Sequence, residues 1–211
     1  MSKAMGVIVL VFWPALAWSQ GVTIAALGDS LTQGYGLPAE QGFVPQLERW
    51  LQDQGHDVDV INAGVSGDTT AGGLSRVDWT LTPDVDALIV TLGGNDLLRG
   101  IAPEVSRANL DGILSAANAA DVDVLLVGMQ APGNYGPEYK AAFDGMYPDL
   151  ASAYDTLFVE SFFEGLGGAG VDPASLGAFM QADGIHPNAA GVARIVEGLG
   201  PAVLDLINRA Q

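Results

Sequence analysis

A serine near the start of the chain has the setting of an exposed nucleophile. Ser30 lies in the run GDSLTQGYG at residues 28–36, directly after the apolar stretch 22–27, which is typical of a buried strand. A serine hydroxyl is nearly inert until a base takes its proton. The chain has only two histidines, and one of them, His186, lies in the run DGIHPN at residues 183–188. We therefore expect Ser30 as nucleophile and His186 as its base.

A carboxylate that can orient this base lies three residues before it. Asp183 is close enough in a turn to reach the second ring nitrogen of His186 and to set its tautomer. Pro187 disfavours helical geometry at His186, so we expect the ring just before the last helix. The other histidine, His56, falls in a predicted helix-to-strand turn at the opposite edge of the sheet, where we expect it to be solvated. The alternative for Ser30 is a helix N-cap.

Two further residues are candidates for stabilising an oxyanion. Acyl transfer puts negative charge on a carbonyl oxygen, which needs fixed N–H groups nearby. Asn95 offers a side-chain amide, and Gly64 offers a backbone N–H with no Cβ to block approach. The alternative for both is turn formation, because residues 93–96 (GGND) are a strong turn signal. We expect Asp96 to hydrogen-bond local backbone.

Composition excludes several classes of function. The 211 residues carry a formal net charge of −17 with only 8 Lys and Arg, so nucleic-acid binding and attraction to anionic membranes are disfavoured. Cysteine is absent, which excludes disulfides, thiolate catalysis and a lipid-bearing cysteine. With two histidines far apart in sequence, no metal-ligand spacing is present. We expect no metal, no cofactor and a monomer.

The first residues have the pattern of a secretory signal. Lys3 gives a modest positive start, residues 6–16 are apolar, and the small residues Ala17 and Ser19 have the spacing of a cleavage site. The apolar run is too short to span a bilayer comfortably. We predict a signal peptide over residues 1–19 and a periplasmic or secreted bacterial protein without stable membrane insertion after cleavage. The alternative is an uncleaved anchor.

Strand-like and helix-like segments alternate along the rest of the chain. Apolar strands separated by helices predict an α/β fold with a parallel sheet covered on both faces, in one domain over residues 20–211. Pro148 is expected to break or kink its helix, and Gly200-Pro201 to kink the last helix. Strands are expected at residues 22–27, 58–62, 87–92, 124–128 and 156–160, and helices at 43–54, 71–81, 105–120, 138–154 and 189–208.

The candidate residues all follow predicted strands. In open parallel sheets, ligands bind beyond the carboxyl ends of the strands. Ser30, Gly64 and Asn95 come after the first, second and third strands, and the segment with Asp183 and His186 comes after the fifth. We therefore expect four loops to converge on one edge of the sheet.

Four sequence blocks together resemble the SGNH hydrolases, also called the GDSL esterase/lipase family. The blocks are GDSL at 28–31, NAGVSGDT at 62–69, GGND at 93–96 and DGIHP at 183–187. The resemblance implies a triad of Ser30, Asp183 and His186, and an oxyanion hole from Ser30, Gly64 and Asn95. It also implies a three-layer α/β/α sandwich whose flavodoxin-like, five-stranded parallel sheet has the order 2-1-3-4-5.

The loop after the fourth strand points to one branch of this family. Residues 132–136 (PGNYG) look like the loop of the bacterial periplasmic group with thioesterase, lysophospholipase and arylesterase activities. Following a strand on the same edge as Ser30, the loop residues Pro132, Asn134 and Tyr135 are expected to line the substrate pocket. The expected function is an exported serine esterase that hydrolyses small-molecule or lipid esters or thioesters. The alternatives are a carbohydrate O-acetylesterase and a non-catalytic binding module.

Overall fold

The protein is built on one five-stranded parallel sheet with strand order β2-β1-β3-β4-β5. The structure is a computed structural model and describes residues 21–168 and 176–211. The predicted strand order and fold class are confirmed. The strands are β1 (Val22–Gly28), β2 (Val58–Gly64), β3 (Ala87–Thr91), β4 (Asp123–Val127) and β5 (Leu157–Val159). The helices are α1 (Ser30–Gln33), α2 (Phe43–Asp53), α3 (Thr70–Thr80), α4 (Gly94–Leu98), α5 (Pro103–Ala119), α6 (Pro137–Tyr154) and α8 (Ala189–Arg209), with short 3-10 turns η1 (Ala39–Gln41), η2 (Glu164–Leu166) and η3 (Gly177–Phe179).

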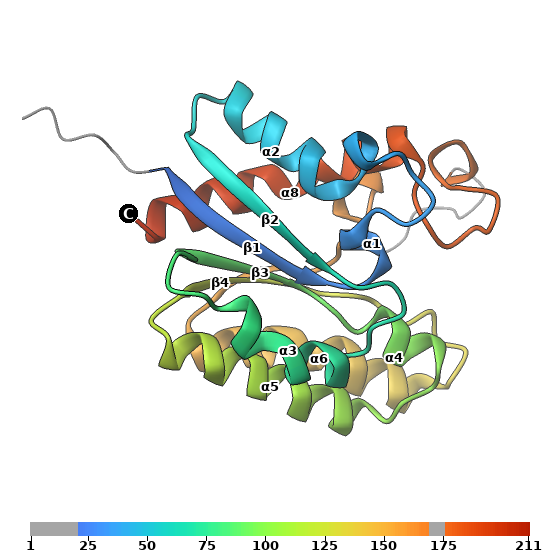
Figure 1. Cartoon of the computed structure of the whole chain (residues 1–211). Helices are drawn as coiled ribbons and strands as arrows, with labels where there is room; N and C mark the ends of the chain where they lie inside the picture. Colours follow the sequence, from blue (N-terminus) through green and yellow to red (C-terminus); the bar gives the residue numbers. More distant parts are fainter. Residues whose placement is uncertain (1–20, 169–175) are drawn as a thin grey trace, which may run out of the picture.

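Helices cover both faces of this sheet. Helices α2 and α8 lie on one face, and α3, α5 and α6 lie on the other (Figure 1). Parallel strands need such crossover helices, and the helices exclude water from both faces. The α/β/α sandwich follows from this arrangement.

Alternate residues of the central strands pack into two separate hydrophobic cores, one on each face of the sheet. Ile24 and Ala26 of β1 pack into the core beneath α2 and α8, whereas Ala25 and Leu27 pack toward α3, α5 and α6. The same alternation occurs along β3, which is buried throughout. This period of two explains why these strands read as continuous apolar runs in the sequence.

Helices α2 and α8 are amphipathic and bury one apolar face each. Phe43, Leu47 and Leu51 of α2 are fully buried, as are Ile195, Leu199, Val203, Leu206 and Ile207 of α8. Trp50 is only half-buried and lies against Gly200 of α8, where a Cβ on the glycine would approach the indole ring to 2.5 Å. Small residues at this crossing therefore let α2 and α8 approach each other.

Two local expectations differ from the structure. Residues 93–96 were predicted as a turn, but helix α4 begins at Gly94, because Gly93 adopts a φ of 117° and turns the chain directly into a helix. A break or kink was predicted at Pro148, yet α6 is not broken there, because buried Tyr147 and Leu150 anchor it to the sheet on both sides of the proline. Helix α8 runs through Pro201, as the helix predicted over residues 189–208 does.

The predicted signal peptide, residues 1–19, lies outside the described residues. None of the helices in the described ranges is long and apolar enough to cross a membrane.

The carboxyl ends of the strands meet at one edge of the sheet. Gly28, the last residue of β1, pairs in register with Gly64 of β2 and with Thr91 of β3. The segments that leave these three strand ends are α1, the loop before α3, and α4, which gather at the same end of the sheet (Figure 1). The candidate site is assembled on this edge.

Candidate active site

Ser30 is the first residue of the short helix α1. Asp29 caps this helix, because its Oδ1 accepts a hydrogen bond from the backbone N–H of Leu31 at 3.0 Å. The N-cap alternative considered for Ser30 therefore belongs to its neighbour. The hydroxyl of Ser30 remains available for another partner.

Three side chains form a continuous hydrogen-bonded chain at this edge. His186 Nε2 lies 2.9 Å from Ser30 Oγ, and His186 Nδ1 lies 2.7 Å from Asp183 Oδ2. The ring nitrogen facing a carboxylate carries the proton, which leaves the other nitrogen as the acceptor for the serine O–H. This arrangement can remove a proton from the Ser30 hydroxyl.

The segment that carries His186 is fastened to the rest of the site by backbone contacts. The backbone carbonyl of His186 accepts a hydrogen bond from the backbone N–H of Gln181 at 2.8 Å. The side-chain amide of Gln181 in turn donates to the carbonyl of Tyr35 at 2.8 Å. Asn188 then caps α8 by accepting from the N–H of Gly191 at 3.0 Å. His186 thus lies just before the last helix, where its side chain meets the segment that follows α1.

Hydrogen bonds keep Asp183 ionised. Its Oδ1 accepts from the backbone N–H groups of Ile185 and His186, at 2.9 and 3.0 Å. These bonds, led by those from His186, lower the pKa of Asp183 to about 2. The carboxylate therefore stays charged at neutral pH and favours a protonated Nδ1 on His186.

Asp29 has the opposite electrostatic character. Its side chain is buried, and this desolvation raises its pKa to about 6 in spite of hydrogen bonds from Leu31 and Asn95. The Asn95 Nδ2 donates to Asp29 Oδ2 at 3.2 Å. An amide nitrogen carries two hydrogens, so the second remains free to donate elsewhere. Asp29 thus links the helix of Ser30 to the helix of Asn95.

Gly93 determines how Asn95 enters the site. A side chain at this position is excluded, because a Cβ would lie 2.1 Å from Tyr147 Oη and the φ of 117° favours glycine. The buried Tyr147 hydroxyl donates to the carbonyl of Leu92 at 2.9 Å. The end of β3 and the start of α4 are therefore held against α6.

The backbone N–H of Gly64 is already paired. It donates to Asn62 Oδ1 at 3.0 Å, in a local turn. A Cβ on Gly64 would also lie 2.3 Å from the backbone nitrogen of Gln33, so this glycine permits close contact with α1. The pairing argues against the predicted oxyanion role of Gly64.

Three residues further on, Gly67 has the property that Gly64 lacks. Its N–H makes no hydrogen bond to any residue within the described ranges. The loop around it lies between the two candidate helices: Ser66 Oγ donates to Gln33 Oε1 of α1 at 2.9 Å, and Arg99 after α4 donates to the Gly67 carbonyl at 2.7 Å. Sequence reasoning missed Gly67, although its place inside the NAGVSGDT block was a usable signal.

Asp96 does not bind local backbone as expected. Its side chain is fully buried and accepts from the Thr70 N–H at 2.8 Å, the Thr70 hydroxyl at 2.6 Å and the Ser106 hydroxyl at 2.9 Å. These partners belong to α3 and α5, so Asp96 ties three helices together. Sequence reasoning could not find partners that become neighbours only in the folded chain.

The loop predicted to line the pocket lies to one side of Ser30. Pro132 and Asn134 are exposed, and Tyr135 packs on Tyr139 with ring centroids 4.9 Å apart and faces Gly100, just after α4. The loop therefore borders the helix of Asn95 rather than the serine itself.

A shallow hollow lies directly beside the serine. Its lining residues are Ser30, Leu31, Gly34, Tyr35, Leu37, His186, Pro187 and Val192. The Tyr35 ring lies 4.7 Å from the His186 ring and was not predicted as a site residue. A roomier hollow of about 120 Å³ lies at the opposite edge, beside the start of β4, and contains none of the candidate residues. The hollow at Ser30 is the candidate substrate site, because the hydrogen-bonded groups Ser30 and His186 line it.

The remaining histidine lies apart from this constellation. His56 is half-buried in the turn between α2 and β2, at the amino end of that strand. Within residues 21–168 and 176–211, no group of three or more His, Asp or Glu side chains is arranged to hold a metal ion.

A three-layer α/β/α sandwich whose parallel sheet carries a hydrogen-bonded serine, histidine and aspartate at its carboxyl edge has the architecture of a serine hydrolase, and sequence comparison gives its family. Residues 26–194 match the GDSL-like Lipase/Acylhydrolase family, and the chain belongs to this family.

Individual relatives agree with this assignment. The chain is 42% identical to "Esterase TesA" of Pseudomonas aeruginosa over 88% of this chain and 89% of the relative. It is 35% identical to "Thioesterase 1/protease 1/lysophospholipase L1" of Escherichia coli K12 over 88% of this chain and 85% of the relative. The crystal structure of AlinE4, a SGNH-hydrolase family esterase, superposes with a TM-score of 0.72 at 42% identity, covering 90% of this chain and 98% of that one. The protein is therefore a hydrolase of ester bonds, which removes the binding-module alternative.

Proposed function

We propose that the protein is an exported serine esterase that hydrolyses acyl esters or thioesters through Ser30, His186 and Asp183. The observation that supports this most directly is the hydrogen-bonded chain from Asp183 Oδ2 through the His186 ring to Ser30 Oγ, with distances of 2.7 and 2.9 Å. A nucleophile, a base and a group that orients the base are the parts that acyl transfer through a serine requires.

The first half of the reaction acylates the serine. Ser30 Oγ attacks the substrate carbonyl carbon while its proton passes to His186 Nε2, and the carbonyl oxygen becomes an oxyanion. When the tetrahedral intermediate collapses, the bond to the leaving oxygen or sulfur breaks, and the leaving group takes the proton from His186. The acyl group remains on Ser30.

The second half restores the enzyme. A water molecule gives a proton to His186 Nε2 and attacks the acyl carbon. The Ser30 oxygen then leaves as the carboxylic acid forms and recovers its proton from the histidine. Asp183 stays ionised throughout, because its pKa of about 2 lies far below neutral pH, and it stabilises the imidazolium in both halves.

The oxyanion is stabilised by three N–H donors in this proposal. The N–H of Ser30 opens α1, where the first N–H groups of a helix have no intrahelical partner. Asn95 offers its second amide hydrogen, and Gly67 offers an N–H free of any described partner. We place the third donor at Gly67 instead of Gly64, whose N–H is paired with Asn62.

Substrate class and location extend the proposal. The names of the relatives refer to esterase, arylesterase, thioesterase and lysophospholipase activities. We assign small-molecule or lipid acyl esters as the substrates of this chain. In this proposal Tyr35 contacts the substrate beside Ser30 and His186, and the loop with Pro132, Asn134 and Tyr135 borders the substrate pocket farther from Ser30. We also propose that residues 1–19 are a cleaved signal and that residues 20–211 form one exported domain. The N-terminal sequence of protein recovered from the periplasm or medium tests this export.

Replacement of the nucleophile tests the chemistry. Ser30→Ala should lower kcat for p-nitrophenyl esters by about 10⁴-fold or more, because loss of a triad member removes the covalent route. The far-UV circular dichroism spectrum should not change, because Ser30 does not cap α1. A fluorophosphonate should label the wild type but not this variant. If Ser30→Ala retained a tenth of the wild-type kcat, the assignment of Ser30 as the nucleophile would be wrong.

A further inference from the structure

We propose that Arg76 is a positioning residue for the reaction, which holds the end of the nucleophile strand and the Gly67 loop at a fixed separation. This inference rests on the proposed function, because it concerns the Ser30 nucleophile and its oxyanion donors. Arg76 lies in the middle of α3 and does not belong to the hollow beside Ser30.

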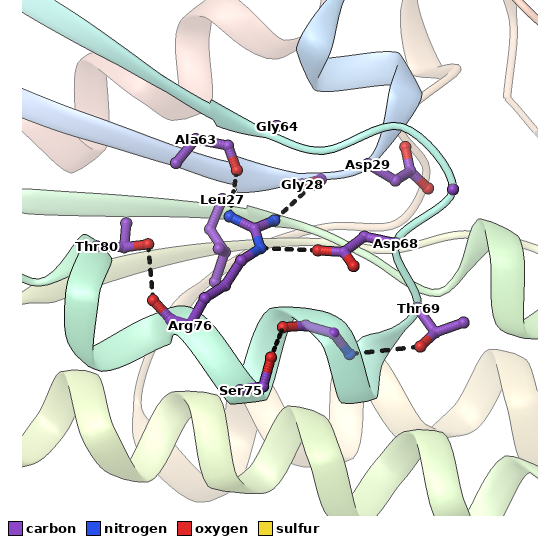
Figure 2. A network of polar contacts seen from close by, with 12 residues as sticks. Leu27, Gly28, Asp29, Ala63, Gly64, Asp68, Thr69, Ser75, Arg76 and Thr80 are labelled. Carbon is purple, nitrogen blue, oxygen red and sulfur yellow. Dashed lines mark hydrogen bonds and ion pairs between the residues drawn. The ribbon is translucent and has the colours of Figure 1, made fainter.

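The guanidinium of Arg76 binds three separate segments at once. Its Nε donates to Asp68 Oδ2 at 2.7 Å, its Nη1 to the Ala63 carbonyl at 2.6 Å and its Nη2 to the Gly28 carbonyl at 2.9 Å. Figure 2 shows the side chain extending from α3 toward the ends of β1 and β2, with Asp68 beside it. The side chains of Arg76 and Asp68 are only 22% and 17% exposed, so this is a largely enclosed pair.

Two of these three contacts lie next to residues of the proposed machinery. Gly28 immediately precedes Asp29 and Ser30, and its carbonyl also accepts from the Val65 N–H at 3.0 Å. Asp68 immediately follows Gly67. Because the guanidinium is planar and rigid, its three donors impose one relative geometry on the nucleophile strand and the loop.

The start of α3 is shaped to receive the Asp68 carboxylate. A Cβ on Gly72 would lie 2.0 Å from Asp68 Oδ1, so a side chain there would displace the carboxylate. Thr69 Oγ1 accepts from the Gly72 N–H at 3.4 Å and caps the helix at the same point (Figure 2). The turn before α3 and the Arg76 contact are thus parts of one arrangement.

The other side of the loop is held by a second arginine. Arg99, at the end of α4, donates to the Gly67 carbonyl at 2.7 Å, but its side chain is exposed. The loop is therefore bound from the Asn95 side by an exposed contact and from the Ser30 side by the enclosed Arg76. A displacement of about 1 Å at a reacting group can cost roughly 100-fold in rate, so loss of the enclosed contact should be visible in turnover.

Substitution of Arg76 tests the proposal. Arg76→Gln should lower kcat by about 10–100-fold and change KM by less than about threefold, because Arg76 acts on the donors and not on bound substrate. Arg76→Lys should fall between wild type and Arg76→Gln, because an ammonium is a point charge that cannot bind three segments in one plane. The matched control is Arg107→Gln, which loses only the exposed ion pair with Asp149 and should keep wild-type kcat.

A second variant covers the case in which Arg76→Gln does not fold. Asp68→Asn keeps the shape of the partner, weakens the Nε contact and should lower kcat by about tenfold at constant KM. The proposal is overturned if a folded Arg76→Gln or Asp68→Asn retains the kcat of Arg107→Gln, or if either changes KM alone. Ser30→Ala distinguishes failure of the proposed function from failure of this inference. If Ser30→Ala keeps full activity, the proposed function is wrong. If Ser30→Ala is inactive and Arg76→Gln has the kcat of Arg107→Gln, only the inference about Arg76 is wrong.

Discussion

The hydrogen bond between Asn95 and Asp29 gives the side-chain amide a defined orientation. A carboxylate accepts hydrogen bonds and cannot donate when ionised, so Asp29 requires the nitrogen of Asn95, and not its oxygen, to face it. The same nitrogen then presents its second hydrogen. An acidic residue beside the proposed oxyanion site thus determines which way the amide points.

Removal of this amide should affect turnover more than binding. Asn95→Ala should lower kcat by roughly 10²–10³-fold with little change in KM, because the amide bonds the substrate oxygen most strongly once it is charged. Steady-state kinetics with one p-nitrophenyl ester give both constants. Asn118→Ala, an exposed asparagine at the far end of α5, should behave as wild type. A change in KM alone for Asn95→Ala would mean that the residue binds the ground state instead.

The buried carboxyl of Asp29 should also make stability depend on pH. Its folded pKa of about 6 exceeds the ordinary value of 3.8, so between these values the folded chain binds more protons than the unfolded chain. The stabilising contribution of Asp29 to the free energy of unfolding is therefore fully present below pH 3.8 and is lost as the pH rises through 6. Above that pH the free energy of unfolding is lower by on the order of 3 kcal/mol.

Urea unfolding of wild type and Asp29→Asn across this pH range measures the effect. The free energy of unfolding of the wild type, relative to the variant, should fall as the pH is raised from 4 to about 6. The variant should also lose turnover, because a neutral amide no longer requires the Asn95 nitrogen to face it. A difference that stays constant or increases with pH would contradict the assigned direction.

The residues that sequence reasoning found are those whose role lies in a local run. Ser30, Asp183 and His186 belong to short motifs, and the structure brings these three side chains together. Tyr35 was missed, because its place beside His186 depends on a neighbour from another segment, and Gly67 was missed although it lies in one of the sequence blocks. Gly64 illustrates the limit: whether its N–H is free depends on the rotamer of Asn62, which no sequence pattern specifies.

At the scale of the elements, the positions of strands and helices were predictable because they depend on periodicity, whereas the strand order was predicted from the family resemblance. The run at residues 87–92 is apolar at every position and became the fully buried β3. The start of α4 was not predictable in the same way, because GGND is compatible with both a turn and a helix. Packing of Gly93 against Tyr147 decided between them.

Helix α4 should therefore tolerate no side chain at its entry. Gly93→Ala should reduce the free energy of unfolding by roughly 2–5 kcal/mol, since it combines backbone strain with a clash against Tyr147 Oη. The matched control is Gly145→Ala in α6, where a Cβ meets nothing within 4 Å. That variant should be stabilised by about 0.5–1 kcal/mol through helix propensity. Equal effects from both alanines in chemical denaturation would refute the role given to Gly93.

At the scale of the whole molecule, the surface is strongly acidic. The formal net charge is −17, and two of the few basic side chains, Arg76 and Arg99, are hydrogen-bonded to backbone carbonyls. Anionic substrates should be repelled on approach, and this repulsion is screened by salt. For an ester bearing a free carboxylate, we expect kcat/KM to rise about threefold or more from low salt to a few hundred millimolar NaCl. A neutral ester with the same leaving group should change little, and parallel behaviour of the two esters would refute the effect.

The bond between Ser30 and His186 joins residues 156 positions apart in the chain. After Ser30 has been synthesised, most of the chain must still be made before His186 exists, and α8 begins just after His186. In the proposed mechanism, a partly made chain therefore carries an unactivated serine, and ester cleavage begins only when the two ends of the fold have met. The appearance of esterase activity would then mark the completion of both synthesis and folding.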